Sequence, residues 1–203
     1  GDTSMDAILT EIAASAPDIV YFPLFEPESN FIAAQLVNTP GLEDTIMMTA
    51  DGSLVASFPE NTGDAAIGIY MSGPSIVSEA YDEFLVVWDD EIGGAPPSGF
   101  HAHAYDATMM LLSAVEEVAV VGDDGSLVIG RQALRDAIAG IEGYEGLTGT
   151  LTCQSESPYA GDCATGTALA IFEVTDAHVN GEDSFPPSET VWDLSMSMMM
   201  DDE

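Results

Sequence analysis

Residues 1–74 alternate between short apolar runs and segments with helical spacing, and this alternation limits the folds that the chain can adopt. The clearest run is Ile-Val-Tyr-Phe at residues 19–22, which lies between two prolines, and residues 45–49 and 67–71 form two more. Short runs that are apolar throughout are typical of strands buried in a parallel sheet. We therefore expect three strands in this part of the chain.

The segments between these runs are predicted to be helices. Apolar residues before the first run recur at positions i, i+3, i+4 and i+7: Met5, Ile8, Leu9 and Ile12. Pro27 suits the first position of a second helix over residues 27–37. Strands that alternate with helices are typical of βαβ units, so the sequence predicts an α/β fold with a parallel sheet.

The rest of the chain is predicted to contain helices over residues 76–88, 101–120 and 131–141, and strands over residues 147–153 and 169–174. In the helix at 101–120, four apolar residues form the expected buried face: Tyr105, Met109, Leu112 and Val115. A turn is expected at residues 178–181. Residues 184–203 have no core pattern and are predicted to form an extended acidic tail.

Acidic residues outnumber Lys and Arg by 36 to 2, and the formal net charge is −34. So negative a surface repels phosphate groups, which excludes nucleic acids and anionic membrane surfaces as partners. Hydrophobic residues make up 46% of the chain, which argues against intrinsic disorder. The acid excess fits the solubility of a secreted protein, adaptation to a salty medium that screens the charges, or binding of polyvalent cations.

The cysteines and the hydropathy pattern bear on where the protein works. Cys153 and Cys163 bracket a segment with Pro158 and Gly161, which favours a turn closed by a disulfide over a metal pair, since no His or further Cys is near. A persistent disulfide indicates an oxidising compartment.

No run reaches the roughly 18 apolar residues of a membrane span. Export would require a targeting segment upstream of Gly1, because acidic residues follow Gly1 directly.

Several short blocks, taken in order along the chain, resemble a known family. They are Gly-Asp-Thr at 1–3, Ala-Pro-Asp-Ile-Val-Tyr-Phe at 16–22, Phe-Glu-Pro-Glu at 25–28, Ala-Asp-Gly at 50–52, Ala-x-Gly-x-Tyr at 66–70, Ala-Tyr-Asp-Ala at 104–107 and Gly-Leu-Thr-Gly-Thr-Leu at 146–151. Over residues 1–176 the chain resembles the second half of type I periplasmic binding proteins. The nearest group is the branched-chain amino-acid (Leu/Ile/Val) substrate-binding proteins of ABC transporters.

This resemblance implies a type I periplasmic-binding-protein fold, with two Rossmann-like lobes and parallel sheets, that is incomplete in this chain. Such proteins are normally nearly twice as long. Residues 1–74 would form part of the second lobe, residues 75–146 helices largely of the first lobe, and residues 147–183 late strands and a disulfide loop that return to the second lobe. An acidic tail would follow over residues 184–203. The missing N-terminal half would then be a partner of this chain.

Ligands of open parallel sheets bind beyond the carboxyl ends of the strands. Phe25 and Glu26 follow the first predicted strand, and Asp51 and Gly52 follow the second. The resemblance implies that Asp51 pairs with the ammonium group of an amino acid and that Phe25 closes over the ligand side chain. Three other roles stay open: a turn at Asp51-Gly52, a core position for Phe25, and a solvated surface position for Glu26.

Other candidate residues favour structural roles. Tyr105 and Asp106 are expected at a helix start, where an acidic residue suits the helix dipole. His101 and His103 lack a neighbouring Cys or third His, which argues against a zinc site. The segment Asp-Asp-Gly-Ser at 123–126 is expected to be a turn, because it lacks the later Glu of a calcium-binding loop.

No serine-hydrolase, phosphate-loop or dinucleotide-binding motif is found, so we expect no enzyme, cofactor or metal. The resemblance implies an extracytoplasmic solute-binding component of an ABC transporter, in the periplasm or at the cell surface. It would capture an amino acid or amide-like solute by closure of two lobes and present it to a permease, with any contact to the membrane made through a tether outside the chain. The alternative is a ligand-sensing receptor ectodomain or a structural surface protein with the same fold.

Overall fold

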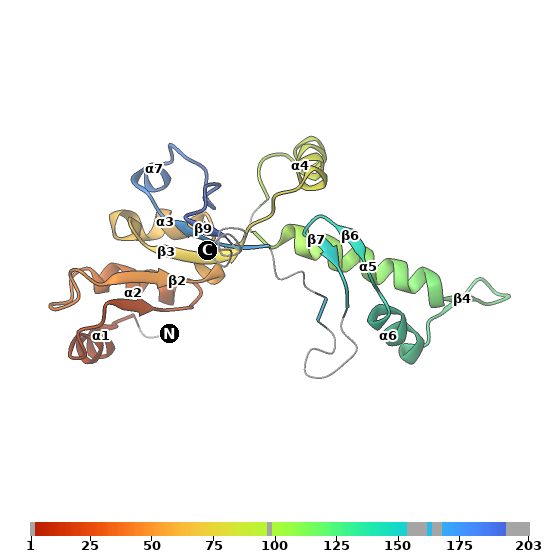
Figure 1. Ribbon diagram of the computed structural model, residues 1–203, viewed down its shortest axis with the longest axis horizontal. Coiled ribbons are helices and arrows are strands. Elements are labelled where there is room, and N and C mark those ends of the chain that lie inside the picture. The colour runs from red at the N-terminus through yellow and green to blue at the C-terminus, as the bar shows by residue number, and fades with distance from the viewer. Residues whose placement is uncertain (1–2, 97–98, 154–161, 164–167, 194–203) are drawn as a thin grey trace, which may run out of the picture. The chain divides into compact units, whose positions relative to one another are not determined.

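A computed structural model describes residues 3–96, 99–153, 162–163 and 168–193 (Figure 1). The chain divides into two compact units, which are described separately. The first unit consists of Gly1–Ser75, Pro97–Gly99 and Leu169–Glu203, and the second of Ile76–Pro96 and Phe100–Ala168.

The first unit contains a sheet whose described strands have the order β1-β2-β3-β8-β9. Their bounds are β1 (Ile19–Tyr21), β2 (Ile46–Thr49), β3 (Tyr70–Pro74), β8 (Leu169–Glu173) and β9 (Trp192–Asp193). The first three strands are parallel, as the alternation of runs and helices predicts, whereas β8 is antiparallel to β3. The α/β fold with a parallel sheet is therefore confirmed.

Two strands differ from the sequence prediction. The third was expected at residues 67–71, but β3 begins at Tyr70 because a 3₁₀ helix, η2 (Gly63–Ala66), and the positive φ of Gly68 (81°) precede it. The predicted acidic tail also contributes β9, which is antiparallel to β8. The Val191 N–H donates to the Ile171 carbonyl oxygen at 2.8 Å, so part of this segment belongs to the sheet. Residues 194–203 of the expected tail lie outside the described residues.

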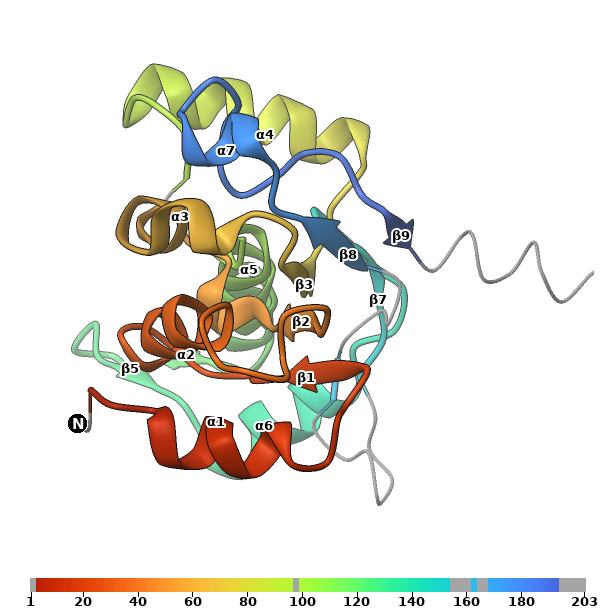
Figure 2. The ribbon, with the colours of Figure 1, turned by 90° about the vertical axis from the view of Figure 1, so that its left-hand side faces the viewer.

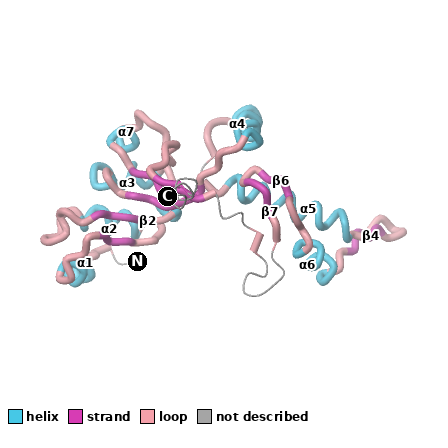
Figure 3. Tube along the Cα trace, in the orientation of Figure 1, coloured by secondary structure: helices cyan, strands magenta, loops and turns pink. Residues whose placement is uncertain are grey.

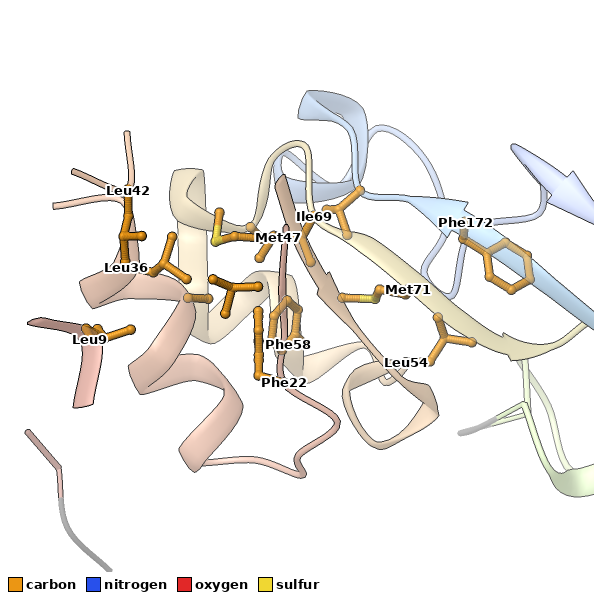
Figure 4. Close-up of a cluster of buried hydrophobic side chains, with 14 of the residues drawn as sticks. Leu9, Phe22, Leu36, Leu42, Met47, Leu54, Phe58, Ile69, Met71 and Phe172 are labelled. Atoms are coloured by element: carbon orange, nitrogen blue, oxygen red, sulfur yellow. The ribbon is translucent and has the colours of Figure 1, made fainter. Parts of the chain in front are cut away.

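Helices α1 (Asp6–Ala13), α2 (Glu28–Leu36) and α3 (Ser57–Thr62) cover the core of the first unit. Figure 2 shows α2 and α3 on the same side of β1, β2 and β3. The buried side chains between helices and strands include Leu9, Leu36, Phe58, Ile69 and Met71 (Figure 4). A single helical turn, α7 (Asp176–Val179), overlaps the expected turn at residues 178–181.

The second unit contains the three predicted helices and two hairpins (Figure 3). The helices are α4 (Glu79–Glu91), α5 (His101–Val118) and α6 (Arg131–Ala139); the hairpin strands are β4 (Val120–Val121), β5 (Leu127–Val128), β6 (Tyr144–Gly146) and β7 (Gly149–Leu151). The strands β4, β5 and β6 were not expected, and β7 is shorter than the strand predicted over residues 147–153. Strands β4 and β5 flank the predicted turn, in which Gly125 has φ +80°.

The predicted buried face of α5 is wrong at three of its four positions, and the fourth, Val115, is half-buried. The buried residues are Ala102, Asp106, Met110 and Ala114. Tyr105, Met109 and Leu112 remain 41%, 36% and 50% exposed. The expected position of Asp106 at a helix start is also wrong, because α5 begins at His101 and Asp106 lies in its second turn.

Asp106 instead anchors the segment between β6 and β7. Its side chain is 2% exposed and accepts hydrogen bonds from the Leu147 N–H at 2.8 Å, the Thr148 N–H at 2.9 Å and the Thr148 hydroxyl at 2.7 Å. Gly146 leaves room for this carboxylate, since a methyl group on Gly146 would lie 2.5 Å from Asp106 Oδ2. A buried carboxylate with three donors therefore determines which face of α5 is turned inward.

The predicted disulfide between Cys153 and Cys163 is confirmed. Cys153 is buried with Met110 and Leu151, so the bond joins the core of the second unit. Residues 154–161 of the enclosed segment lie outside the described residues.

Replacing both cysteines with serine should lower the unfolding free energy of the second unit by about 2–3 kcal/mol, because the crosslink restricts the unfolded chain. The measurement is urea unfolding followed by the fluorescence of Trp88 in a Trp192→Phe background. Reductant should destabilise the parent protein and leave the double variant unchanged. Equal midpoints for the parent with and without reductant would contradict the prediction.

Candidate ligand-binding site

The three parallel strands bring their carboxyl ends to one edge of the sheet, where the loops after β1 and β2 meet. Asp51 begins a short 3₁₀ helix, η1 (Asp51–Ser53), directly after β2. Phe25 and Glu26 lie in the loop between β1 and α2. The structure thus places all four residues predicted from the sequence after the expected strands.

Two buried hydroxyls hold these loops together. Thr49 and Ser53 are fully buried. The Thr49 hydroxyl donates to the Phe22 carbonyl oxygen at 2.9 Å, and the Ser53 hydroxyl donates to the Leu24 carbonyl oxygen at 3.2 Å. The two hydroxyl oxygens lie 3.2 Å apart. Because buried polar groups require partners, this network fixes the position of the loop after β1 against the loop after β2.

Phe25 and Gly52 lie against each other across these loops. The Phe25 side chain is 72% exposed, so it is not a core residue. A methyl group on Gly52 would lie 3.0 Å from Cδ1 of the Phe25 ring and 2.9 Å from the Leu24 carbonyl oxygen. The absence of a side chain at Gly52 therefore lets the aromatic ring approach the start of η1.

Asp51 completes this group of neighbours. It is partly exposed, and a methyl group on Gly73 of β3 would lie 3.8 Å from Asp51 Cβ. None of the described residues donates a hydrogen bond to its carboxylate. The edge of the sheet thus combines an unpaired carboxylate with an exposed aromatic ring, an arrangement that suits a small ligand with a cationic group and an apolar part.

Glu26 is bound within the first unit. Its carboxylate accepts hydrogen bonds from Asn30 Nδ2 at 2.6 Å, Asn61 Nδ2 at 3.1 Å and the Ser57 hydroxyl. Partial burial raises the pKa of Glu26, but the bonds from Ser57, Asn30 and Asn61 outweigh burial and hold its pKa below the usual value of 4.5. Glu26 therefore connects α2 to α3, next to Phe25.

Because the pKa of Glu26 is lower in the folded protein, its carboxylate stabilises the fold fully above about pH 4.5 and less as the pH falls through the folded-state pKa. Glu26→Gln should therefore be less stable than the parent at pH 7, and the difference should shrink towards zero in acid. Chemical unfolding across this pH range measures it. Glu60→Gln, at an exposed position of α3, controls for the loss of one negative charge. A constant difference at all pH values would contradict the prediction.

Near the start of α5, His101 belongs to an aromatic cluster, and His103 contacts the Phe100 ring. Tyr81 Oη and His101 Nε2 lie 2.8 Å apart, and the Phe84 ring stacks on the His101 ring at 6.0 Å. Burial lowers the pKa of His103; the smaller effect of Asp106 raises it, and that of His101 lowers it further. Within the described part of the chain, no group of three or more His, Cys, Asp or Glu residues is placed to hold a metal ion.

A surface groove of about 330 Å³ lies elsewhere in the first unit. Its polar lining includes Glu173, His178 and Glu189. Since Glu173 pairs with Tyr70, the first residue of β3, this groove lies at the amino ends of the parallel strands. Open parallel sheets bind ligands beyond the carboxyl ends of their strands, so this groove lies at the opposite end of the sheet. None of the predicted site residues lines the groove.

Comparison with known proteins identifies the family of the chain. Residues 1–178 match the model of a family described as periplasmic binding protein. This chain belongs to the periplasmic binding protein family. The resemblance inferred from the sequence blocks is therefore confirmed. No curated protein sequence matches the chain closely enough to serve as a relative.

Solved structures of this periplasmic binding protein fold share low sequence identity with the chain. The leucine binding protein LivK from Thermotoga maritima is 20% identical, with a TM-score of 0.67 over 92% of this chain and 49% of that protein. A putative branched-chain amino acid ABC transporter protein from Rhodospirillum rubrum is 22% identical, with a TM-score of 0.62 over 91% and 48%. A type 1 periplasmic binding protein from Bordetella pertussis is 16% identical, with a TM-score of 0.67 over 92% and 50%.

The chain thus spans about half the length of these periplasmic binding proteins. Its family is one of binding proteins. None of the described helices is both long and apolar enough to cross a membrane.

Proposed function

We propose that this chain is part of an extracytoplasmic solute-binding protein of an ABC transporter. Its ligand is an amino acid or an amide-like small solute, captured by closure of two lobes. The observation that carries this proposal is the Asp51 carboxylate at the carboxyl end of β2, next to Phe25 and Gly52, to which none of the described residues donates a hydrogen bond.

The chemistry of an amino acid explains why these groups are needed. Its ammonium group requires an anion when it is buried, because an unpaired buried charge is very unfavourable. Asp51 provides that anion, and the exposed Phe25 ring provides a surface for an apolar side chain. Glu26 supports the site by holding the loop that carries Phe25.

The ligand carboxylate requires donors from the rest of the protein. We assign these donors to an N-terminal half of the same protein outside this chain, which makes that half a partner of this chain. Closure of the two lobes buries the solute, and the closed form is what a membrane permease recognises. A tether outside this chain would keep the protein at the membrane.

Isothermal calorimetry on the complete two-lobed protein tests the proposal. Leucine, valine, a polar amino acid and a short amide are titrated separately. Heat of binding is expected from at least one amino acid or amide, and the 203-residue chain alone is expected to bind each of them much more weakly. No heat from any of the four would overturn the proposal.

A sensing role is the second candidate, because one similar solved structure is described as an extracellular ligand-binding receptor from Rhodopseudomonas palustris. Neighbouring genes for a permease and an ATPase would support transport. A membrane span or kinase downstream in the same protein would support sensing.

A further inference from the structure

The first unit contains many carboxylates and no Lys or Arg. More than half of the 36 acidic residues of the chain lie in this unit, and His178 is its single histidine. The two arginines of the chain, Arg131 and Arg135, both lie on α6 of the second unit. The carboxylates of the first unit therefore have no Lys or Arg in the same unit to pair with, and they repel one another wherever they are close.

Most of these carboxylates lie at the surface of the first unit. Among its described acidic residues, all are exposed except Glu26, Glu28, Asp51, Glu173 and Asp193, which are partly buried. Glu26 accepts its hydrogen bonds from hydroxyl and amide groups, which stabilise the carboxylate without cancelling its charge. The negative charge of the unit is therefore left to be compensated by cations of the solvent.

The groove at the amino ends of the parallel strands brings several of these charges together. Glu173 is the last residue of β8, and Asp183 and Glu189 belong to the segment between α7 and β9. All three line the groove, and the rest of its lining consists of hydroxyl residues, His178 and Val191. Folding therefore gathers three carboxylates around a confined space against their mutual repulsion.

Dissolved salt determines how strongly such charges repel. The Debye length is about 10 Å at 0.1 M ionic strength and about 3 Å at 1 M, so salt at molar concentration screens all but the closest pairs. Uniform charge acts against the compact state, because folding brings the charges closer together. Since the stability of a domain is a small difference between large opposing contributions, unscreened repulsion of this kind can prevent folding.

We propose that the first unit folds only when dissolved cations screen its carboxylates, and that the protein works in a medium of high ionic strength. Of the three explanations for the acid excess, solubility alone requires no salt. Binding of polyvalent cations requires clustered ligands, and among the residues that the structure describes no group of three or more His, Cys, Asp or Glu is placed to hold a metal ion. The distributed carboxylates favour diffuse screening, which is independent of solute binding.

Urea unfolding at different KCl concentrations tests the proposal on the 203-residue chain. Each unit contains one tryptophan, Trp192 in the first and Trp88 in the second. Trp192 fluorescence in a Trp88→Phe background follows the first unit, and Trp88 fluorescence in a Trp192→Phe background follows the second. Between about 0.1 M and about 2 M KCl, the folding equilibrium constant of the first unit should rise about 100-fold or more, and that of the second unit, which carries both arginines, should rise less.

Two double variants separate screening of carboxylates from a general effect of salt on apolar burial. Asp183→Asn with Glu189→Gln removes two carboxylates from the groove, and Glu116→Gln with Glu117→Gln removes two exposed carboxylates from α5 of the second unit. Both reduce the net negative charge equally. At the lower KCl concentration the groove variant should raise the folding equilibrium constant of the first unit about 10-fold, and at the higher concentration it should have little effect. The α5 variant should leave the first unit close to the parent at both.

Three results would overturn the proposal. One is a first unit that is equally stable at both KCl concentrations or that folds at neither. Another is a groove variant whose dependence on salt equals that of the parent protein. The third is full stability at the lower KCl concentration after addition of about 1 mM MgCl₂, which barely changes the ionic strength and would identify bound divalent cations as the cause. No solute is present in these measurements, so they are separate from the calorimetric test of binding.

Discussion

Asp51→Asn is expected to weaken solute binding by the complete protein about 30-fold or more. The substitution keeps the size of the side chain and removes its charge. A buried ammonium group would then lose its anion, and breaking a buried charge pair of this kind costs about 2–5 kcal/mol of binding free energy. Calorimetry with the solute that binds the parent protein measures the loss.

The control for this prediction is Asp18→Asn. Asp18 is exposed and precedes β1, at the opposite end of the strands. Both substitutions reduce the net negative charge by one, so both weaken the long-range attraction of a cation by the acidic surface to a similar extent. Only the Asp51 variant removes a local partner. Equal affinities of the two variants would show that Asp51 does not contact the ligand.

Much of the first unit could be predicted from sequence because its signals are local. The apolar run at residues 19–22 between two prolines identifies β1, and the periodicity before it identifies α1. The sequence did not reveal β9, because Trp192 and Asp193 form a strand only by pairing with β8, which is distant in the sequence. The shift of β3 also depends on a distant partner, since the Gly68 N–H donates to the Val174 carbonyl oxygen.

The error on α5 has a related cause. Apolar periodicity favours Tyr105 and Met109 as the inward face, and it assigns a charged residue such as Asp106 to the surface. The partners that justify burying Asp106 lie 41 and 42 residues further along the chain. The periodicity reports only the spacing of apolar residues along the helix, so it contains no information on such hydrogen-bond partners.

The candidate site was predictable in part. Asp51, Gly52 and Phe25 could be placed together because parallel strands end at the same edge of a sheet. The supporting residues Thr49 and Ser53 were missed, because their burial depends on carbonyl groups of the other loop. Two hydroxyl residues that flank Asp51-Gly52 are the signal that could have indicated them.

The largest expected loss of stability comes from Asp106→Ala. The substitution leaves the buried N–H groups of Leu147 and Thr148 without acceptors and removes the charged partner of the Thr148 hydroxyl. Unsatisfied buried donors and lost bonds to a charged group together should lower the unfolding free energy of the second unit by about 3–4 kcal/mol. Trp88 fluorescence during urea unfolding, in the Trp192→Phe background, reports the change.

Two further variants separate the anchoring role of Asp106 from its charge. Glu116→Ala removes an acid from an exposed position of the same helix and should change stability by less than about 0.5 kcal/mol. Thr148→Val removes one of the three donors, so it should be destabilising in the parent and nearly neutral when Asp106 is already alanine. Such non-additivity identifies a direct bond between the two side chains. If Asp106→Ala and Glu116→Ala have the same effect, the carboxylate does not anchor the segment between β6 and β7.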